Sequence, residues 1–194
     1  IIKKSLDINL DLFMIFVDIN LGWTNYIQLA EKRVPEFRDN IIVLDGDVPY
    51  KPEYRAKSRI VADAGNFLFL PLVIEKDIFE LLKDHSAFLR FQSSFSRIPG
   101  FSYDICFNNW PLDSGKYRTV DFKHWFAQTI SVLGDENVLF SFWCSEHQDV
   151  AEKFVESFIT LFNVLAEKME VDALPAADTM SEEGMSDIPE EMKE

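Results

Sequence analysis

The sequence predicts an α/β fold in which a mainly parallel sheet is flanked by helices. Two observations carry this prediction. Apolar runs of strand length occur at 12–17, within 40–44 and at 67–70. Segments whose apolar residues recur at helical spacing follow the first and the third of these runs, at 23–33 and 74–83. This alternation is typical of parallel strands joined by crossover helices. The chain has 194 residues and is 47% hydrophobic, which is enough for the core of one sizeable domain.

The first fifty residues are expected to form a βαβ unit. The apolar run 12–17 fits a buried strand, and a short helix is the alternative. Gly22 ends this segment, and apolar residues at helical spacing predict a helix over 23–33. The next strand is predicted at 40–44. The two strands of such a unit lie parallel, with a right-handed crossover.

The middle of the chain continues the alternation. A loop of mixed charge is expected to run to about Gly65, followed by a strand at 67–70 and a helix over 74–83. Residues 86–117 contain a dense series of aromatic residues. Because this series is interrupted by prolines and Gly100, we expect an aromatic-rich helical insertion with a small core of its own.

Two helices are expected to close the fold. The first covers 119–133, and the second begins at a capping box over 145–148 and ends near Met169. The predicted domain therefore covers 1–169. Residues 170–194 are acidic and poor in apolar side chains, so burial cannot offset the entropy of ordering them, and we expect a disordered tail.

The charge of the chain bears on its partners. The formal net charge is −14. A generic nucleic-acid binder usually has a basic face, so a DNA contact of this acidic chain needs a local patch or another domain. The one candidate patch, at 51–59, is more simply explained as a solvated loop, and its basic residues are Lys51, Arg55, Lys57 and Arg59.

Cysteine content and hydropathy bear on the location of the protein. Cys106 and Cys144 stand far apart, with no signal peptide before them, and are expected to be reduced thiols in the cytoplasm. No apolar run approaches the roughly 20 residues needed to cross a bilayer, so no membrane association is expected. The chain begins Ile1-Ile2, from which we expect a processed or partial chain.

Two carboxylates follow the strand predicted at 40–44. Asp45 and Asp47 are separated only by Gly46, which allows a sharp turn that brings both side chains to one side of the strand end. Ligands of open α/β sheets collect at the carboxyl ends of strands. Two carboxylates there can share a hard cation, Mg²⁺ or Mn²⁺. An ordinary Asp-Gly turn without a metal is the alternative.

A third acid is predicted near the same edge of the sheet. Glu75 lies in the first turn of the helix predicted after the next strand, where the helix macrodipole alone favours an acid. The functional alternative is that Glu75 reaches the cation of Asp45 and Asp47. The spacing of the histidines matches no zinc site, and the sequence has no glycine-rich phosphate loop; the histidines are His85, His124 and His147.

A set of short motifs occurs in a particular order along the chain: Gly22-Trp23, Val43-Leu44-Asp45-Gly46-Asp47-Val48, Leu70-Pro71, Ile74-Glu75-Lys76, Phe122-Lys123-His124-Trp125-Phe126, Val155-Glu156-Ser157-Phe158 and Phe162-Asn163. In their order and spacing together, these motifs resemble the TOPRIM domain at the carboxyl end of the OLD (overcoming lysogenization defect) family of ATP-dependent nucleases. The resemblance covers most of 10–168.

The resemblance implies a magnesium-dependent DNA endonuclease domain of an ATPase-linked machine, of the kind that includes anti-phage defence proteins. Asp45 and Asp47 would hold the metal, Glu75 would be a further acidic ligand, and Lys123 would offset charge on the phosphate. For Lys123, an exposed helix lysine without such a role is the alternative. The implied partners are DNA, an ATPase domain of the same or another chain, and further copies of this chain. The family also uses a glutamate after an earlier strand; residues 1–7 offer no counterpart, so we expect the chain alone to be incomplete.

Two other functions are compatible with the same residues. A nucleotide-sugar glycosyltransferase also uses an Asp-x-Asp at a strand end, to hold Mn²⁺ against a diphosphate, although the expected upstream nucleotide-binding strand is absent. A non-catalytic interaction module is the third hypothesis, and the acidic tail and the missing glutamate motivate it. A dehalogenase-type phosphatase is disfavoured because Val48-Pro49 follows the second aspartate.

Overall fold

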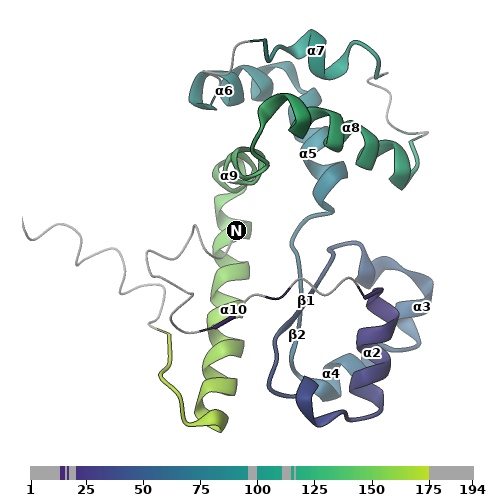
Figure 1. The fold of residues 1–194 in the computed structure, drawn as a ribbon, viewed down its shortest axis with the longest axis vertical. Coiled ribbons are helices and arrows are strands. Elements are labelled where there is room, and N and C mark those ends of the chain that lie inside the picture. The colour runs from purple at the N-terminus through teal and green to yellow at the C-terminus, as the bar shows by residue number, and fades with distance from the viewer. Residues whose placement is uncertain are drawn as a thin grey trace, which may run out of the picture. The chain divides into compact units, whose positions relative to one another are not determined.

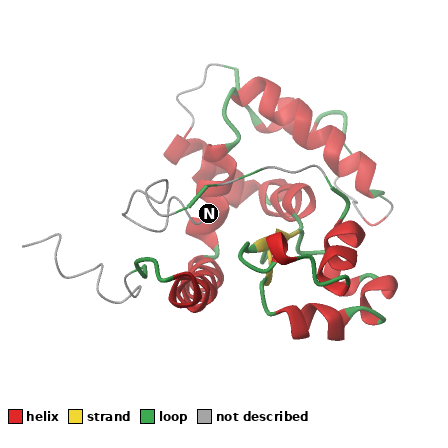
Figure 2. Ribbon diagram, turned by 60° about the horizontal axis from the view of Figure 1, so that its bottom comes forward, coloured by secondary structure: helices red, strands yellow, loops and turns green. Residues whose placement is uncertain are grey.

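The computed structural model describes residues 14, 15, 17, 21–95, 100–110, 115 and 117–174. The chain divides into two compact units, which are described separately. The first unit consists of Ile1–Leu44, Val48–Phe69 and Asp149–Glu194, and the second of Asp45–Asp47 and Leu70–Gln148. Helices predominate in both, and Figure 2 shows the two short strands in yellow. Within the described ranges, no helix has the length and hydropathy of a membrane span.

The first unit is built on two parallel strands. β1 (Ile42–Leu44) pairs with β2 (Phe67–Phe69), with Ile42 opposite Phe67 and Leu44 opposite Phe69. The coarse prediction of an α/β fold with parallel strands is confirmed, although the sheet described here has only two strands. Before β1 come α2 (Trp23–Glu31, Figure 1) and the 3₁₀ turn η2 (Pro35–Phe37). The bounds of α2 are close to those of the helix predicted at 23–33.

The strand expected at 12–17 lies outside the described residues, except for Met14, Ile15 and Val17. The parallel pair that is described therefore joins the second and third of the predicted strands. Buried Ile42, Leu44 and Val48 form the centre of its core. Partly buried aromatic side chains pack around them, namely Trp23, Tyr26, Phe37, Tyr54, Phe67 and Phe69.

The crossover between the strands corrects one sequence prediction. Residues expected to form a loop to Gly65 instead form η3 (Val48–Tyr50), α3 (Pro52–Arg55) and α4 (Ser58–Ala64). Pro52 begins α3, where its missing N–H costs nothing. Gly65 ends α4 at φ 68°, a left-handed conformation that glycine adopts without a Cβ clash. These short helices carry many charges and few inward-facing apolar residues, so the sequence shows no clear helical period there.

The last described helix is α10 (Gln148–Met169). Its buried residues recur at helical spacing, as predicted. Beyond it, the first residues of the expected disordered tail fold back. The Asn163 side chain donates from Nδ2 to the Leu174 carbonyl (3.0 Å) and accepts from the Leu174 amide (2.8 Å). Leu174 itself is buried. The remainder of the predicted tail lies outside the described residues.

The second unit is helical within its described residues. It contains α5 (Ile74–Lys83), α6 (His85–Phe95), α7 (Tyr103–Phe107), α8 (Thr119–Leu133) and α9 (Asn137–Glu146). The bounds of α5 and α8 agree with the predicted helices. The segment 86–117, predicted as an insertion, lies in this unit together with α5, α8 and α9.

An aromatic cluster forms the core of the second unit. Phe79 of α5 is fully buried, and the rings of four residues meet it edge-on with centroids 5.0 to 5.5 Å away. These residues are Phe107, Tyr117, Phe122 and Trp125. Edge-on packing brings the positive edge of one ring to the negative face of the next. The aromatic residues of 86–117 thus share their core with α5 and α8.

The capping box predicted at 145–148 is wrong. Ser145 and Glu146 belong to the last turn of α9, where Ser145 Oγ donates to the Phe142 carbonyl (2.7 Å), and α10 begins only at Gln148. The sequence analysis missed α9 because its residues 138–143 are apolar at nearly every position. A segment without a polar face has no helical period to detect.

Candidate metal centre and a second hollow

The Asp45-Gly46-Asp47 turn follows β1 directly and packs against the segment that follows β2. Gly46 is buried. A Cβ on Gly46 would lie 2.5 Å from the carbonyl oxygen of Leu70 and closer still to that of Leu72. Real Cβ atoms do not approach backbone oxygens so closely. Glycine is therefore required here for close approach of two backbone segments, and the aspartates stand on either side of that contact.

The two aspartates have different surroundings. Asp45 is exposed, whereas Asp47 is half-buried and its Oδ1 atom is buried. Their placement at the carboxyl end of β1 agrees with the sequence prediction. Carboxylate oxygens are hard donors, and Mg²⁺ in proteins is commonly held by only one or two carboxylates while it keeps several waters. The chemistry of this pair therefore fits a hard divalent cation.

Glu75 stands in the first turn of α5, as predicted. The neighbouring Asp77, rather than Glu75, serves the start of the helix, because its Oδ2 accepts the Val73 amide at 2.7 Å. Glu75 is half-buried and lines an open hollow of about 640 Å³ between α5 and the start of α8. The other residues of this hollow are Val73, Lys76, Glu80, Gly115, Tyr117, Thr119 and Phe122.

Lys123 lies on α8 next to Phe122 of this hollow, and its side chain is exposed. It forms no ion pair with any residue that the structure describes. Among the described residues there is also no group of three or more His, Cys, Asp or Glu side chains placed to hold one metal ion. The structure therefore presents Asp45 and Asp47 as neighbours in one turn and does not gather Glu75 with them into a three-acid cluster.

Two of the histidines contact tryptophan rings, and Cys106 is buried. His147 stacks on Trp143 with ring centroids 4.6 Å apart, and His124 meets Trp110 edge-on at 5.6 Å. No disulfide joins Cys106 to Cys144. Burial raises the pKa of the Cys106 thiol to about 12, which keeps it protonated at neutral pH.

The basic residues at 51–59 do not form one continuous patch of available charge. Lys57 lies 3.9 Å from Glu31, and Arg59 lies 3.9 Å from Asp63. Lys51 lies over the Trp23 ring, 5.9 Å from its centroid. Three of the four cations thus have a partner within the first unit, in line with a solvated surface rather than a dedicated DNA contact.

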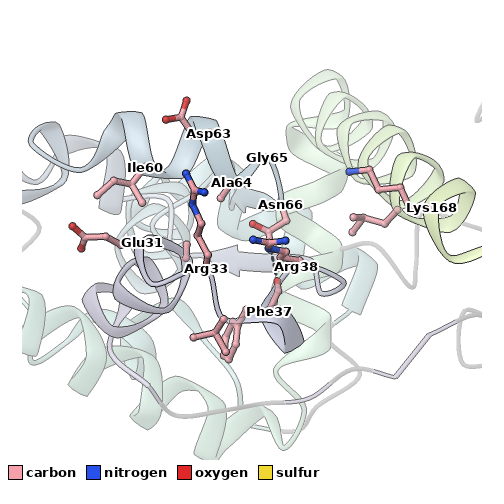
Figure 3. A pocket seen from close by; sticks show the side chains of 13 residues that line it. Glu31, Arg33, Phe37, Arg38, Ile60, Asp63, Ala64, Gly65, Asn66 and Lys168 are labelled. Carbon is pink, nitrogen blue, oxygen red and sulfur yellow. Dashed lines mark hydrogen bonds between the residues drawn. The ribbon is translucent and has the colours of Figure 1, made fainter.

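The sequence analysis missed a second hollow, of about 460 Å³, which lies in the first unit (Figure 3). It is lined by parts of α2, α4 and α10 and by the segment around η2. Three cations line it, namely Arg33, Arg38 and Lys168. They are far apart in the sequence, and the only local signal is the pair of arginines on either side of Pro35.

Comparison of the chain with protein-family models, with curated proteins and with solved structures gives no match in any of the three.

Proposed function

We propose that the protein is the metal-binding part of a DNA endonuclease of the TOPRIM type and that Asp45 and Asp47 hold a Mg²⁺ or Mn²⁺ ion. One observation carries the proposal most directly. The glycine between the two acids is buried against the carbonyl oxygens of Leu70 and Leu72, so the turn that directly follows β1 in the chain is packed against the segment that directly follows β2. An ordinary exposed Asp-Gly turn needs no such packing.

The chemistry follows from the charges. When bound, the divalent cation lowers the pKa of a coordinated water and offsets charge on the phosphate. Asp45 and Asp47 supply the negative charge that retains the cation. Burial of Asp47 Oδ1 limits the freedom of that carboxylate, which reduces the entropy lost on binding. Lys123 and Glu75 are the further residues of the proposal, as charge stabiliser and additional acid.

The metal-binding step can be tested without activity. Titration of the chain with Mn²⁺, followed by the electron paramagnetic resonance signal of free Mn²⁺, measures the affinity directly. We expect Asp45→Asn combined with Asp47→Asn to weaken binding by at least about tenfold, because two carboxylate ligands are lost. Asp104→Asn is the matched control, since Asp104 is an exposed acid of the same unit.

Glu75 and Lys123, the two further residues of the proposal, are tested one at a time. Glu75→Gln is expected to weaken Mn²⁺ binding less than the double aspartate variant does. Lys123→Gln is expected to leave Mn²⁺ affinity unchanged, because a lysine does not bind the metal, and to lower DNA nicking. If Asp45→Asn with Asp47→Asn leaves Mn²⁺ affinity unchanged, the proposed site is wrong and a non-catalytic interaction module is the better explanation.

A second set of measurements separates nuclease from glycosyltransferase. Nicking of supercoiled plasmid DNA in the presence of Mg²⁺ or Mn²⁺, abolished in the double aspartate variant, is the expected outcome for the protein joined to its ATPase partner. Manganese-dependent binding of a nucleoside diphosphate sugar, measured by calorimetry, would instead favour the glycosyltransferase. Both functions use the same aspartates, so only the substrate distinguishes them.

A further inference from the structure

The hollow in the first unit has the size of a small-molecule site. Its volume of about 460 Å³ falls within the range of about 300–1,000 Å³ that is usual for ligand pockets. It lies beside the amino ends of β1 and β2, because Arg38 comes shortly before β1 and Asn66 directly before β2. The proposed metal site uses none of these residues.

The charges around this hollow favour an anion. Its two acids each lie 3.9 Å from a cation, Glu31 from Lys57 and Asp63 from Arg59. The three cations of the hollow form no ion pair with any residue in the described ranges; they are Arg33, Arg38 and Lys168. Figure 3 shows the Arg38 guanidinium beside the Asn66 side chain and the Arg33 guanidinium between Ile60 and Ala64. These cations favour a negatively charged ligand in the hollow, although the chain as a whole has a net charge of −14.

Asn66 adds a specific requirement. Its side chain is buried, with 4% of its surface exposed, and both protons of Nδ2 are used, by the carbonyl oxygens of Phe37 (2.6 Å) and Asn40 (2.9 Å). These bonds define which end of the amide is oxygen. Asn66 Oδ1 is buried and accepts no hydrogen bond from a described residue. A buried acceptor of this kind is unfavourable until a donor reaches it.

The backbone at Arg33 supports a role for its side chain. Arg33 has φ 54° just after α2, in the left-handed region that usually holds glycine at this position. An arginine there is strained relative to glycine, so the local fold alone does not account for it. Arg33 is one of the residues that line the hollow.

We propose that this hollow binds a small phosphorylated ligand that also carries a hydrogen-bond donor. Arg33, Arg38 and Lys168 hold the phosphate, which carries up to two negative charges near neutral pH. Asn66 Oδ1 accepts a hydroxyl or amino proton of the same ligand. Arginine suits the phosphate because its planar fork can donate two parallel hydrogen bonds.

The choice of anion tests the donor requirement. We would titrate the full chain by calorimetry with ribose 5-phosphate, inorganic phosphate and sulfate, at pH 7 and fixed ionic strength in chloride. Both phosphates carry hydroxyl protons, whereas sulfate carries none. We expect sulfate to bind at least about tenfold more weakly than ribose 5-phosphate, because its oxygen lone pairs would face Asn66 Oδ1. Equal affinities for the two would overturn the donor requirement, and no binding of any anion would overturn the site.

Comparison of inorganic phosphate with ribose 5-phosphate shows whether the ligand is a phosphate ester or the free ion. Tighter binding of ribose 5-phosphate indicates an ester as ligand, whereas equal binding indicates the free ion, and either supports the shared chemistry. Arg38→Gln should weaken phosphate binding by at least about tenfold. Arg55→Gln is the matched control, an exposed arginine of the same unit outside the hollow, and should change nothing.

Arg33→Gly provides a variant that should fold better and bind worse. Removing the side chain relieves the strain at φ 54°, so the melting temperature should rise while phosphate binding weakens. A higher melting temperature with unchanged binding would overturn the role of Arg33. If Arg38→Gln lowers DNA affinity while no small phosphate binds, the hollow is a DNA contact and the proposal is wrong. The double variant at Asp45 and Asp47 should bind phosphate normally, whatever its effect on the metal.

Discussion

Gly46 lies against the backbone carbonyl of Leu72, with no space for a side chain between them. We expect Gly46→Ala to destabilise the protein by about 1–3 kcal/mol, the usual cost of overpacking, because the atoms that a Cβ meets are backbone and cannot rotate away. Urea unfolding measures the change.

Gly22→Ser is the control for this prediction. Gly22 has φ −60° at the N-cap of α2, and a Cβ there meets its nearest side-chain atom at an ordinary 3.9 Å. Serine is a good N-cap residue, so we expect a change below about 0.5 kcal/mol. Equal effects of the two substitutions would show that the contact at Gly46 is not tight in solution.

Phe79 joins the aromatic rings of the second unit. Phe79→Ala should lower the free energy of unfolding by about 3–5 kcal/mol, because it leaves a cavity among rings that pack on it edge-on. Leu89→Ala, on an exposed position of α6, should change it by less than about 0.5 kcal/mol. Tryptophan fluorescence during urea unfolding reports mainly this unit, which contains Trp110, Trp125 and Trp143, once Trp23 of the first unit is replaced by Phe. A loss below about 1 kcal/mol for Phe79→Ala would contradict the packing.

The ion pair of Arg90 and Glu146 predicts a dependence of stability on pH. Hydrogen bonding from the Arg90 guanidinium holds the pKa of Glu146 below its ordinary value of 4.5. Because the folded state favours the charged carboxylate, the pair stabilises the protein above pH 4.5, and this contribution is lost as the pH falls through the lowered pKa.

Glu146→Gln tests this dependence. At pH 7 the variant should unfold at lower urea concentration than the parent protein, and below the lowered pKa the difference should vanish. Glu156→Gln, on an exposed position of α10, should show no such difference at either pH. A difference for Glu146→Gln that persists in acid would assign the effect to packing rather than to charge.

The two cysteines should differ in reactivity. Burial raises the pKa of Cys106 from 9.0 to about 12, which lowers its thiolate fraction by about 1000-fold at pH 8. Cys144 is only half-buried. Peptide mapping after iodoacetamide treatment should therefore find Cys144 labelled well before Cys106, and the rates should converge in denaturant. Equal labelling of the native protein would show that the core around Cys106 opens readily.

Elements with a clear hydrophobic period or a strong terminator could be predicted from the sequence. The bounds of α5 and α8 agree with prediction because each has one apolar face, and Gly134 caps the end of α8 at φ 74°. The short strands around 42–44 and 67–69 were predicted from their apolar runs. The apolar helix α9 and the charged crossover helices had no such pattern, so only their packing decided them.

Two features of the candidate metal site are local in the chain: two aspartates follow the strand at 42–44, and a glycine separates them. Such features can be predicted because neighbours along the chain remain neighbours in the fold. Other features come from packing between distant segments: Gly46 is buried against Leu72, Glu75 lines the hollow between α5 and α8, and Arg38 and Lys168 line the hollow of the first unit. Arg38 and Lys168 lie 130 positions apart, since 168 − 38 = 130. Local preference carries no information over that separation, and packing alone brings such residues together.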